Sequence, residues 1–131
     1  MSLVKFLPAW FHAVADYAVG ASLIAVALVV GGSSKAVAAG VVVGAVVLAV
    51  SMLTKYPLGV VKVLPFTIHS AGDYLAAALL LAAPFALGFR DTDSGLSIFY
   101  VAGGLAVLAV SLITNYQYSP KRVSASSPAM A

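Results

Sequence analysis

The sequence predicts an all-α membrane protein, a four-transmembrane-helix bundle built from two parallel tandem helical-hairpin repeats. The first observation behind this prediction is the composition: 63% of the 131 residues are hydrophobic and only 8% are charged, against about 25% charged residues in an ordinary soluble domain. The second is a set of four long apolar runs, and the third is a pattern of polar residues that occurs twice. So few charges cannot cover four apolar runs in water, so we expect a lipid bilayer around most of the chain.

Four apolar stretches are long enough to cross a bilayer as helices. A hydrocarbon core about 30 Å thick requires about 20 residues in helical form. Turn-forming residues separate the stretches, and the short loops between them predict that sequence neighbours pack antiparallel. The predicted spans are residues 8–30, 36–54, 65–88 and 95–117.

The polar pattern divides the chain into two similar halves. Residues 5–17 and 62–74 share the pattern K-x-L-P-x-x-x-H-x-x-x-D-Y, and residues 47–56 match residues 107–116 at Ser, Thr and Tyr positions. Because each half contains two spans, both copies are expected to insert in the same direction and to close on each other as a four-helix bundle. The predicted units are a first hairpin repeat over 1–61, a second over 62–118 and a disordered tail over 119–131.

The positions of the basic residues predict the orientation in the membrane. Lys and Arg are enriched in cytoplasmic segments, and most of these residues lie on one side of the predicted bundle. We therefore expect a multi-pass protein of the inner (plasma) membrane with both termini in the cytoplasm. The expected cytoplasmic residues are Lys5, Lys55, Lys62, Lys121 and Arg122, and those on the other side are Lys35 and Arg90.

The composition also excludes several functions. The chain has no cysteine, which excludes disulfides, thiolate metal sites and iron–sulfur clusters. Its net charge of +3 is spread between the apolar segments, so nucleic-acid binding is not expected. Phosphate-cradling glycine loops and nucleophilic Ser/His/Asp arrangements are missing from the sequence, which argues against an enzyme. A homo-oligomer or a larger membrane complex remains open.

Residues 69–74, His-Ser-Ala-Gly-Asp-Tyr, are followed by the apolar run 79–89 and by a further apolar helix. This order resembles the SPW repeat, a small bacterial and archaeal membrane domain of paired helices. The family is named for a Ser-Pro-Trp signature after its first helix, where this chain has Ala83-Pro84-Phe85 and its first half has Ala27-Leu28-Val29. The resemblance implies a tetraspan membrane fold and supplies no established activity, so no functional residue is taken from it.

Two aspartates are the only acidic residues inside the predicted spans. Asp16 follows His12 by four residues, and Asp73 follows His69 by four residues, so each pair occupies one helix face. At about 1.5 Å per residue, the aspartates lie about 12 Å into their helices from the cytoplasmic side. A carboxylate at that depth is costly unless it faces the bundle interior, so we expect both pairs to meet at one buried site.

Three functions are open for this His/Asp site. In the first, a hydrogen-bond network fixes how the hairpins dock, although Ser, Thr or Asn would serve for packing alone. In the second, the site transports or senses protons or small ions, with the aspartates binding protons and the histidines relaying them. In the third, both pairs hold a divalent metal, or His12 and His69 ligate haem b as an axial pair. The predicted supporting residues are Tyr17, Tyr74, Ser51 and Ser111.

Other features are predicted to be structural. Gly40 and Gly44 form a small-residue motif on the second span, with Gly104 in the place of Gly44 on the fourth, and we expect packing within the chain in preference to dimerisation. Arg90, Asp91 and Asp93 are expected to form a solvated loop. Aromatic residues near the span ends are expected to anchor the protein at the membrane interface: Trp10, Phe11, Tyr56, Tyr100, Tyr116 and Tyr118.

Overall fold

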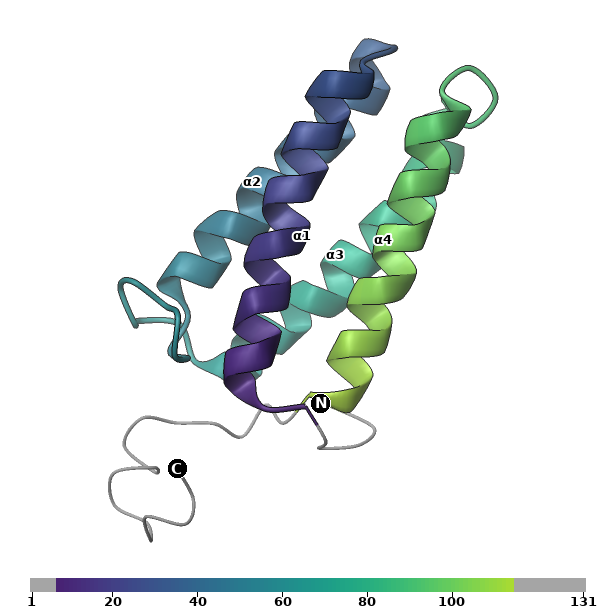
Figure 1. Cartoon of the computed structure of the whole chain (residues 1–131). Helices are drawn as coiled ribbons and strands as arrows, with labels where there is room; N and C mark the ends of the chain where they lie inside the picture. Colours follow the sequence, from purple (N-terminus) through teal and green to yellow (C-terminus); the bar gives the residue numbers. More distant parts are fainter. Residues whose placement is uncertain (1–6, 115–131) are drawn as a thin grey trace, which may run out of the picture.

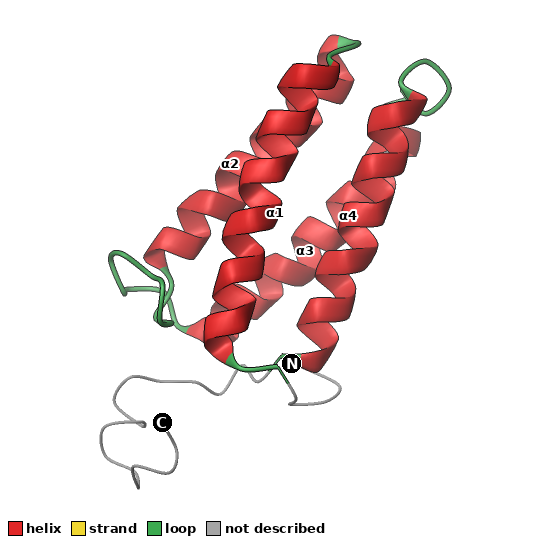
Figure 2. Cartoon of the chain, in the orientation of Figure 1, coloured by secondary structure: helices red, strands yellow, loops and turns green. Residues whose placement is uncertain are grey.

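The computed structural model describes residues 7–114 of the chain. Its regular structure is four long α-helices joined by short connections (Figure 2). The helices are α1 Ala9–Val30, α2 Ser34–Leu53, α3 Phe66–Ala86 and α4 Ser94–Ile113. Each has 20 to 22 residues and is apolar enough to cross a membrane. The predicted all-α bundle of four candidate membrane spans is therefore confirmed.

The helix ends follow local chemistry. Pro8 and Pro65 directly precede α1 and α3, where a missing backbone N–H costs no helical hydrogen bond. The hydroxyl of Ser33 accepts a hydrogen bond from the Ala36 N–H, so α2 begins two residues before its predicted start. α4 ends earlier than predicted, since the backbone of Thr114 is already extended.

Close helix contacts hold each hairpin together. A Cβ atom added at Gly44 would lie 2.7 Å from the Gly20 carbonyl oxygen, so α1 and α2 approach more closely there than a larger residue permits. At the equivalent place in the second hairpin, a Cβ at Gly104 would lie 3.0 Å from the Ala77 carbonyl oxygen of α3. The prediction that these glycines pack within the chain is confirmed.

The two hairpins pack side by side (Figure 1). α1 contacts α2 and α4, and α3 contacts the same two helices, so α1 and α3 face each other diagonally across the bundle. The α1–α2 and α3–α4 loops lie at one end, and the start of α1 lies at the other end beside the α2–α3 connection (Figure 1). A polar group on the inner face of α1 is therefore directed toward α3.

Polar contacts join the hairpins at the end that carries the α1–α2 and α3–α4 loops. The hydroxyl of Tyr100 is buried and donates to the carbonyl oxygen of Ala36 over 2.6 Å, so its predicted role as an interfacial anchor is wrong. The side chain of Asp93 accepts hydrogen bonds from the backbone N–H and the hydroxyl of Ser33, at 3.0 and 2.6 Å. The loop carboxylate is thus solvated but also fastens one hairpin to the other.

Part of the predicted orientation lies outside the described residues. This applies to Lys5, to Lys121 and Arg122, and to the tail over 119–131, as well as to the aromatic residues Tyr116 and Tyr118. Within the described range, the connection that carries Lys55 and Lys62 lies at the opposite end of the bundle from Lys35 and Arg90. The membrane side that each end faces stays a prediction.

Replacing Gly44 with alanine should destabilise the first hairpin. The new methyl group would meet the Gly20 carbonyl at 2.7 Å, and overpacking of this kind costs about 1–3 kcal/mol. Gly103→Ala is the matched control, because the nearest atom to its added Cβ is 4.0 Å away. Thermal unfolding in detergent should show a lower Tm for G44A and an unchanged or higher Tm for G103A; equal effects would contradict the close contact.

The contact between Asp93 and Ser33 should make stability depend on acid pH. The hydrogen bonds that Asp93 accepts from the hydroxyl and N–H of Ser33 lower the pKa of its carboxyl below the ordinary value. The contribution to stability is therefore complete above the unfolded pKa, about 3.9, and is lost as the pH falls through the lower folded value. The Tm of wild type should fall over that acid range by more than the Tm of Asp93→Asn falls. Parallel Tm profiles for the two proteins would refute the effect.

Candidate functional site

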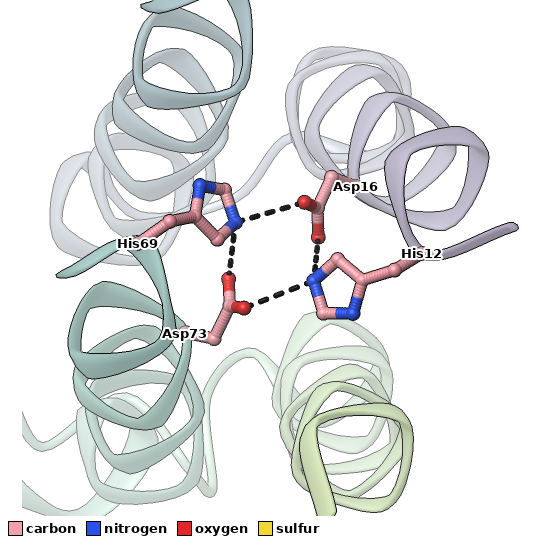
Figure 3. Close-up of side chains that lie close together, drawn as sticks. All are labelled: His12, Asp16, His69 and Asp73. Atoms are coloured by element: carbon pink, nitrogen blue, oxygen red, sulfur yellow. Dashed lines mark ion pairs between the residues drawn. The ribbon is translucent and has the colours of Figure 1, made fainter. Parts of the chain in front are cut away.

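Four ionisable side chains from two helices meet at the centre of the bundle. His12 and Asp16 extend from α1, and His69 and Asp73 extend from α3, as Figure 3 shows. We call these four side chains the His/Asp quartet. All four are buried, with relative exposures of 1% and 2% for the histidines and 8% for each aspartate. The structure thus brings together the two pairs that the sequence placed on separate helices.

The quartet is a closed ring in which imidazoles and carboxylates alternate (Figure 3). The Nε2 atom of His12 lies 3.2 Å from Oδ1 of Asp16 and 2.9 Å from Oδ2 of Asp73. The Nε2 atom of His69 lies 2.9 Å from Oδ2 of Asp16 and 2.9 Å from Oδ1 of Asp73. Each imidazole therefore contacts both carboxylates, and the contacts between hairpins are at least as short as those within a helix.

The positions of these side chains follow from the helix geometry. Residues four apart lie on one face of a helix, so His12 and Asp16 share one face of α1, and His69 and Asp73 share one face of α3. These two faces are directed toward each other across the bundle. Both histidines lie in the first turn of their helices, which begin directly after Pro8 and Pro65. The ring therefore lies near the bundle end that carries the α2–α3 connection.

The outer nitrogen of each imidazole contacts a threonine from the opposite hairpin. The distance from His12 Nδ1 to Thr114 Oγ1 is 2.7 Å, and the distance from His69 Nδ1 to Thr54 Oγ1 is also 2.7 Å. Both threonine hydroxyls donate their only hydrogen to a helix carbonyl, of Val110 or Val50. Each Nδ1 must therefore carry the hydrogen and donate it to threonine, which leaves Nε2 to face the carboxylates.

Tyr56 is a further member of the site that the sequence did not identify. It is fully buried, and its hydroxyl donates to Asp16 Oδ2 over 3.1 Å, so the prediction that it anchors at the membrane interface is wrong. Its ring also packs on Phe66, with ring centroids 5.2 Å apart. Together with Ala9 and Ala13, these two aromatic rings cover the quartet at the bundle end.

Three of the four predicted supporting residues make side-chain hydrogen bonds to groups outside the quartet. Tyr17 donates to the carbonyl oxygen of Leu58, and Tyr74 donates to the carbonyl oxygen of Ser111. The hydroxyl of Ser51 donates to Val47 in its own helix and also contacts the hydroxyl of Tyr56. The hydroxyl of Ser111 is buried and has no hydrogen-bond partner among residues 7–114. Within residues 7–114, Thr54, Thr114 and Tyr56 make further polar contacts to the quartet.

The quartet has the composition of a cation site. One donor atom from each of the four side chains can be chosen so that all lie within 4.8 Å of one another. Imidazole nitrogen and carboxylate oxygen are common ligands of divalent first-row metals. The same four groups balance their charges equally well when the ring contains two protons, because two carboxylates carry two negative charges.

Thr54→Val should destabilise the bundle by removing the acceptor of the His69 Nδ1–H group. A buried donor without a partner costs about 1–3 kcal/mol. Ser70→Ala is the control, since Ser70 is also buried and its hydroxyl also donates to a carbonyl oxygen of its own helix, that of Thr67. Chemical denaturation in detergent should show a clear loss of stability for T54V, a small loss for S70A and near wild-type stability for T54S. Equal losses for T54V and S70A would contradict the assigned hydrogen.

The comparisons with known proteins leave the site to be interpreted from its geometry. Protein-family models, curated proteins and solved structures were compared with the chain, and none matches it. The resemblance of the second half to the SPW repeat therefore stays a prediction. What the chain itself supports is a multi-pass membrane protein with a buried His/Asp cluster.

Proposed function

We propose that this membrane protein handles small ions, and that the His/Asp quartet binds one divalent cation through His12, Asp16, His69 and Asp73. The observation that carries this proposal is the convergence of four buried donor atoms within 4.8 Å at the centre of a candidate membrane bundle. Ionisable residues inside membrane spans are costly and commonly mark ion pathways or ion sites.

The hydrogen positions support a cation at the ring. Because Nδ1 of each histidine donates to threonine, a neutral imidazole directs the lone pair of Nε2 toward two carboxylate oxygens. Lone pairs and carboxylates repel one another unless a cation lies between them. One divalent cation would neutralise both aspartates and accept both nitrogen lone pairs, and it would leave no net charge inside the bundle.

The surroundings of the ring also suit a metal. Histidines that bind metals usually donate their second N–H to a fixed acceptor, which orients the ring. Thr54 and Thr114 supply that acceptor for His69 and His12. Tyr56 fixes one oxygen of Asp16 in the same way. The side chains that would bind the ion are therefore already oriented by partners on other elements.

The donor set favours zinc or a similar first-row metal over calcium or magnesium. Two nitrogen and two oxygen ligands suit Zn²⁺, whereas Ca²⁺ and Mg²⁺ prefer oxygen alone. Tetrahedral Zn²⁺ separates its ligand atoms by about 3.3 Å, and with one ligand atom taken from each side chain the four atoms lie within 4.8 Å of one another. The arrangement favours an ion over haem b, because carboxylates already contact both Nε2 atoms.

Metal-depleted protein in detergent or nanodiscs should bind one equivalent of Zn²⁺ or Co²⁺. The Co²⁺ form should show the strong visible absorption of tetrahedral coordination, displaced by Zn²⁺. Asp16→Asn and Asp73→Asn should each weaken binding by about 10-fold or more, since the loss of even an orienting partner of a metal ligand costs 10–100-fold. Asp91→Asn, in the exposed loop, is the control and should bind as wild type does.

The contrary outcome is equally definite. The proposal of a cation site would be overturned if folded wild-type protein took up no stoichiometric Zn²⁺ or Co²⁺. It would also be overturned if D16N and D73N left the uptake unchanged. The ring would then hold two protons in place of the metal. Proton uptake by the protein in liposomes would separate that ion-handling function from a network that only fixes helix packing.

A further inference from the structure

An apolar groove opens between α2 and α3 and reaches the quartet from the side. Its volume is about 300 Å³, and its walls include Val42 and Val46 of α2 and Leu75 of α3. These wall residues are half-exposed on the surface expected to face lipid, whereas the lining residues His69 and Asp73 are buried. The groove therefore runs from the lipid-facing surface inward to one side of the His/Asp quartet.

The matching place in the other half of the bundle is almost filled. The hollow between α1 and α4 is lined by His12, Asp16 and residues that correspond in the repeat pattern to those lining the groove. Its volume is about 30 Å³, a tenth of that of the groove. Since the same ring of four side chains borders both, the quartet does not by itself require an opening of this size.

Residue differences between the two halves account for this asymmetry. The groove is lined by Gly72 where the small hollow has Ala15, and by Ala76 where the hollow has Val19, so two of its wall residues are smaller. A Cβ atom added at Gly72 would meet no atom within 4 Å. Glycine inside a helix costs about 1 kcal/mol relative to alanine, and here no close packing requires it. The space above Gly72 is therefore a feature of the groove.

The lining indicates what kind of molecule fits. The walls are aliphatic, and the polar lining residues are His69 and Asp73. A fatty-acid carboxylate would be repelled by Asp73, and a strongly charged head would have to leave water to enter from the side. A neutral hydroxyl can donate to a carboxylate oxygen while its apolar body replaces lipid against the valines and leucines.

We propose that the groove between α2 and α3 is a lateral binding site for a neutral, membrane-dissolved amphiphile whose hydroxyl head reaches Asp73 and His69. The site takes its ligand from the bilayer and needs no passage through the Tyr56–Phe66 cover at the bundle end. It depends on the geometry of the groove, and the amphiphile binds whether or not a cation occupies the quartet.

The test uses 4-octylphenol as the probe and octylbenzene, which lacks the hydroxyl, as its matched control. Full-length protein in nanodiscs containing a chelator is titrated with each compound at equal mole fraction in the lipid, and backbone amide NMR shifts are followed. Shifts should saturate around residues 42–50 and 69–79 with 4-octylphenol. Its affinity should exceed that of octylbenzene by about 10-fold, as expected for a hydrogen bond to a charged group.

Two variants on different helices are used, so that the test does not fail if one of them does not fold. Gly72→Val and Val46→Phe each fill the groove from one wall and should abolish saturable binding, whereas Ala15→Val, at the position that matches Gly72, should leave it intact. Both groove variants should still bind Co²⁺, so failure of the groove is distinguishable from failure of the cation site. Equal affinity for octylbenzene, shifts spread over all lipid-facing helices, or unchanged binding in G72V and V46F would each overturn the proposal.

Discussion

The structure depends on how two carboxylates are neutralised inside helices that are apolar enough to cross a membrane. Asp16 and Asp73 lie on α1 and α3, and hydrocarbon offers them no partner. Each aspartate contacts the imidazole of its own helix and that of the other helix, at 2.9 to 3.2 Å. Neither hairpin can supply both contacts alone. Docking of the two hairpins is therefore the condition under which either acid can be buried.

The remaining contacts between the hairpins follow from this central ring. α1 and α3 are diagonal neighbours, so α2 and α4 fill the space on either side of the quartet. Their C-terminal threonines end at the height of the histidines and accept from the outer ring nitrogens. At the far end, Tyr100 and Asp93 join the hairpins a second time. The bundle is fixed at both ends, which holds the ring atoms in place without a close α1–α3 backbone contact.

The sequence predicted the parts of this arrangement that depend on spacing within one helix. The four-residue separation of His and Asp, repeated in register, was sufficient to place four side chains at one site. Tyr56 was missed because its burial depends on how the α2–α3 connection folds over Phe66, which no periodicity reveals. The second contact of Thr54 was missed for a similar reason: its bond to Val50 is local, whereas its bond to His69 requires the other hairpin. The equivalent positions of Thr54 and Thr114 in the two halves of the sequence were the one signal that could have indicated these contacts to the histidines.

The differences between the two halves carry information that the shared pattern does not. A ring of two imidazoles and two carboxylates is satisfied by equal surroundings on its two sides, and the histidines, aspartates and threonines are indeed equivalent. The surroundings are nevertheless unequal, because Gly72 and Ala76 border an open groove where Ala15 and Val19 border a nearly closed hollow. Lipid chains can fill the aliphatic part of the groove, but they offer no hydrogen bond to Asp73 and His69 at its inner end. An opening retained on one side only, at the edge of the ionisable ring, therefore points to a ligand that enters from the membrane.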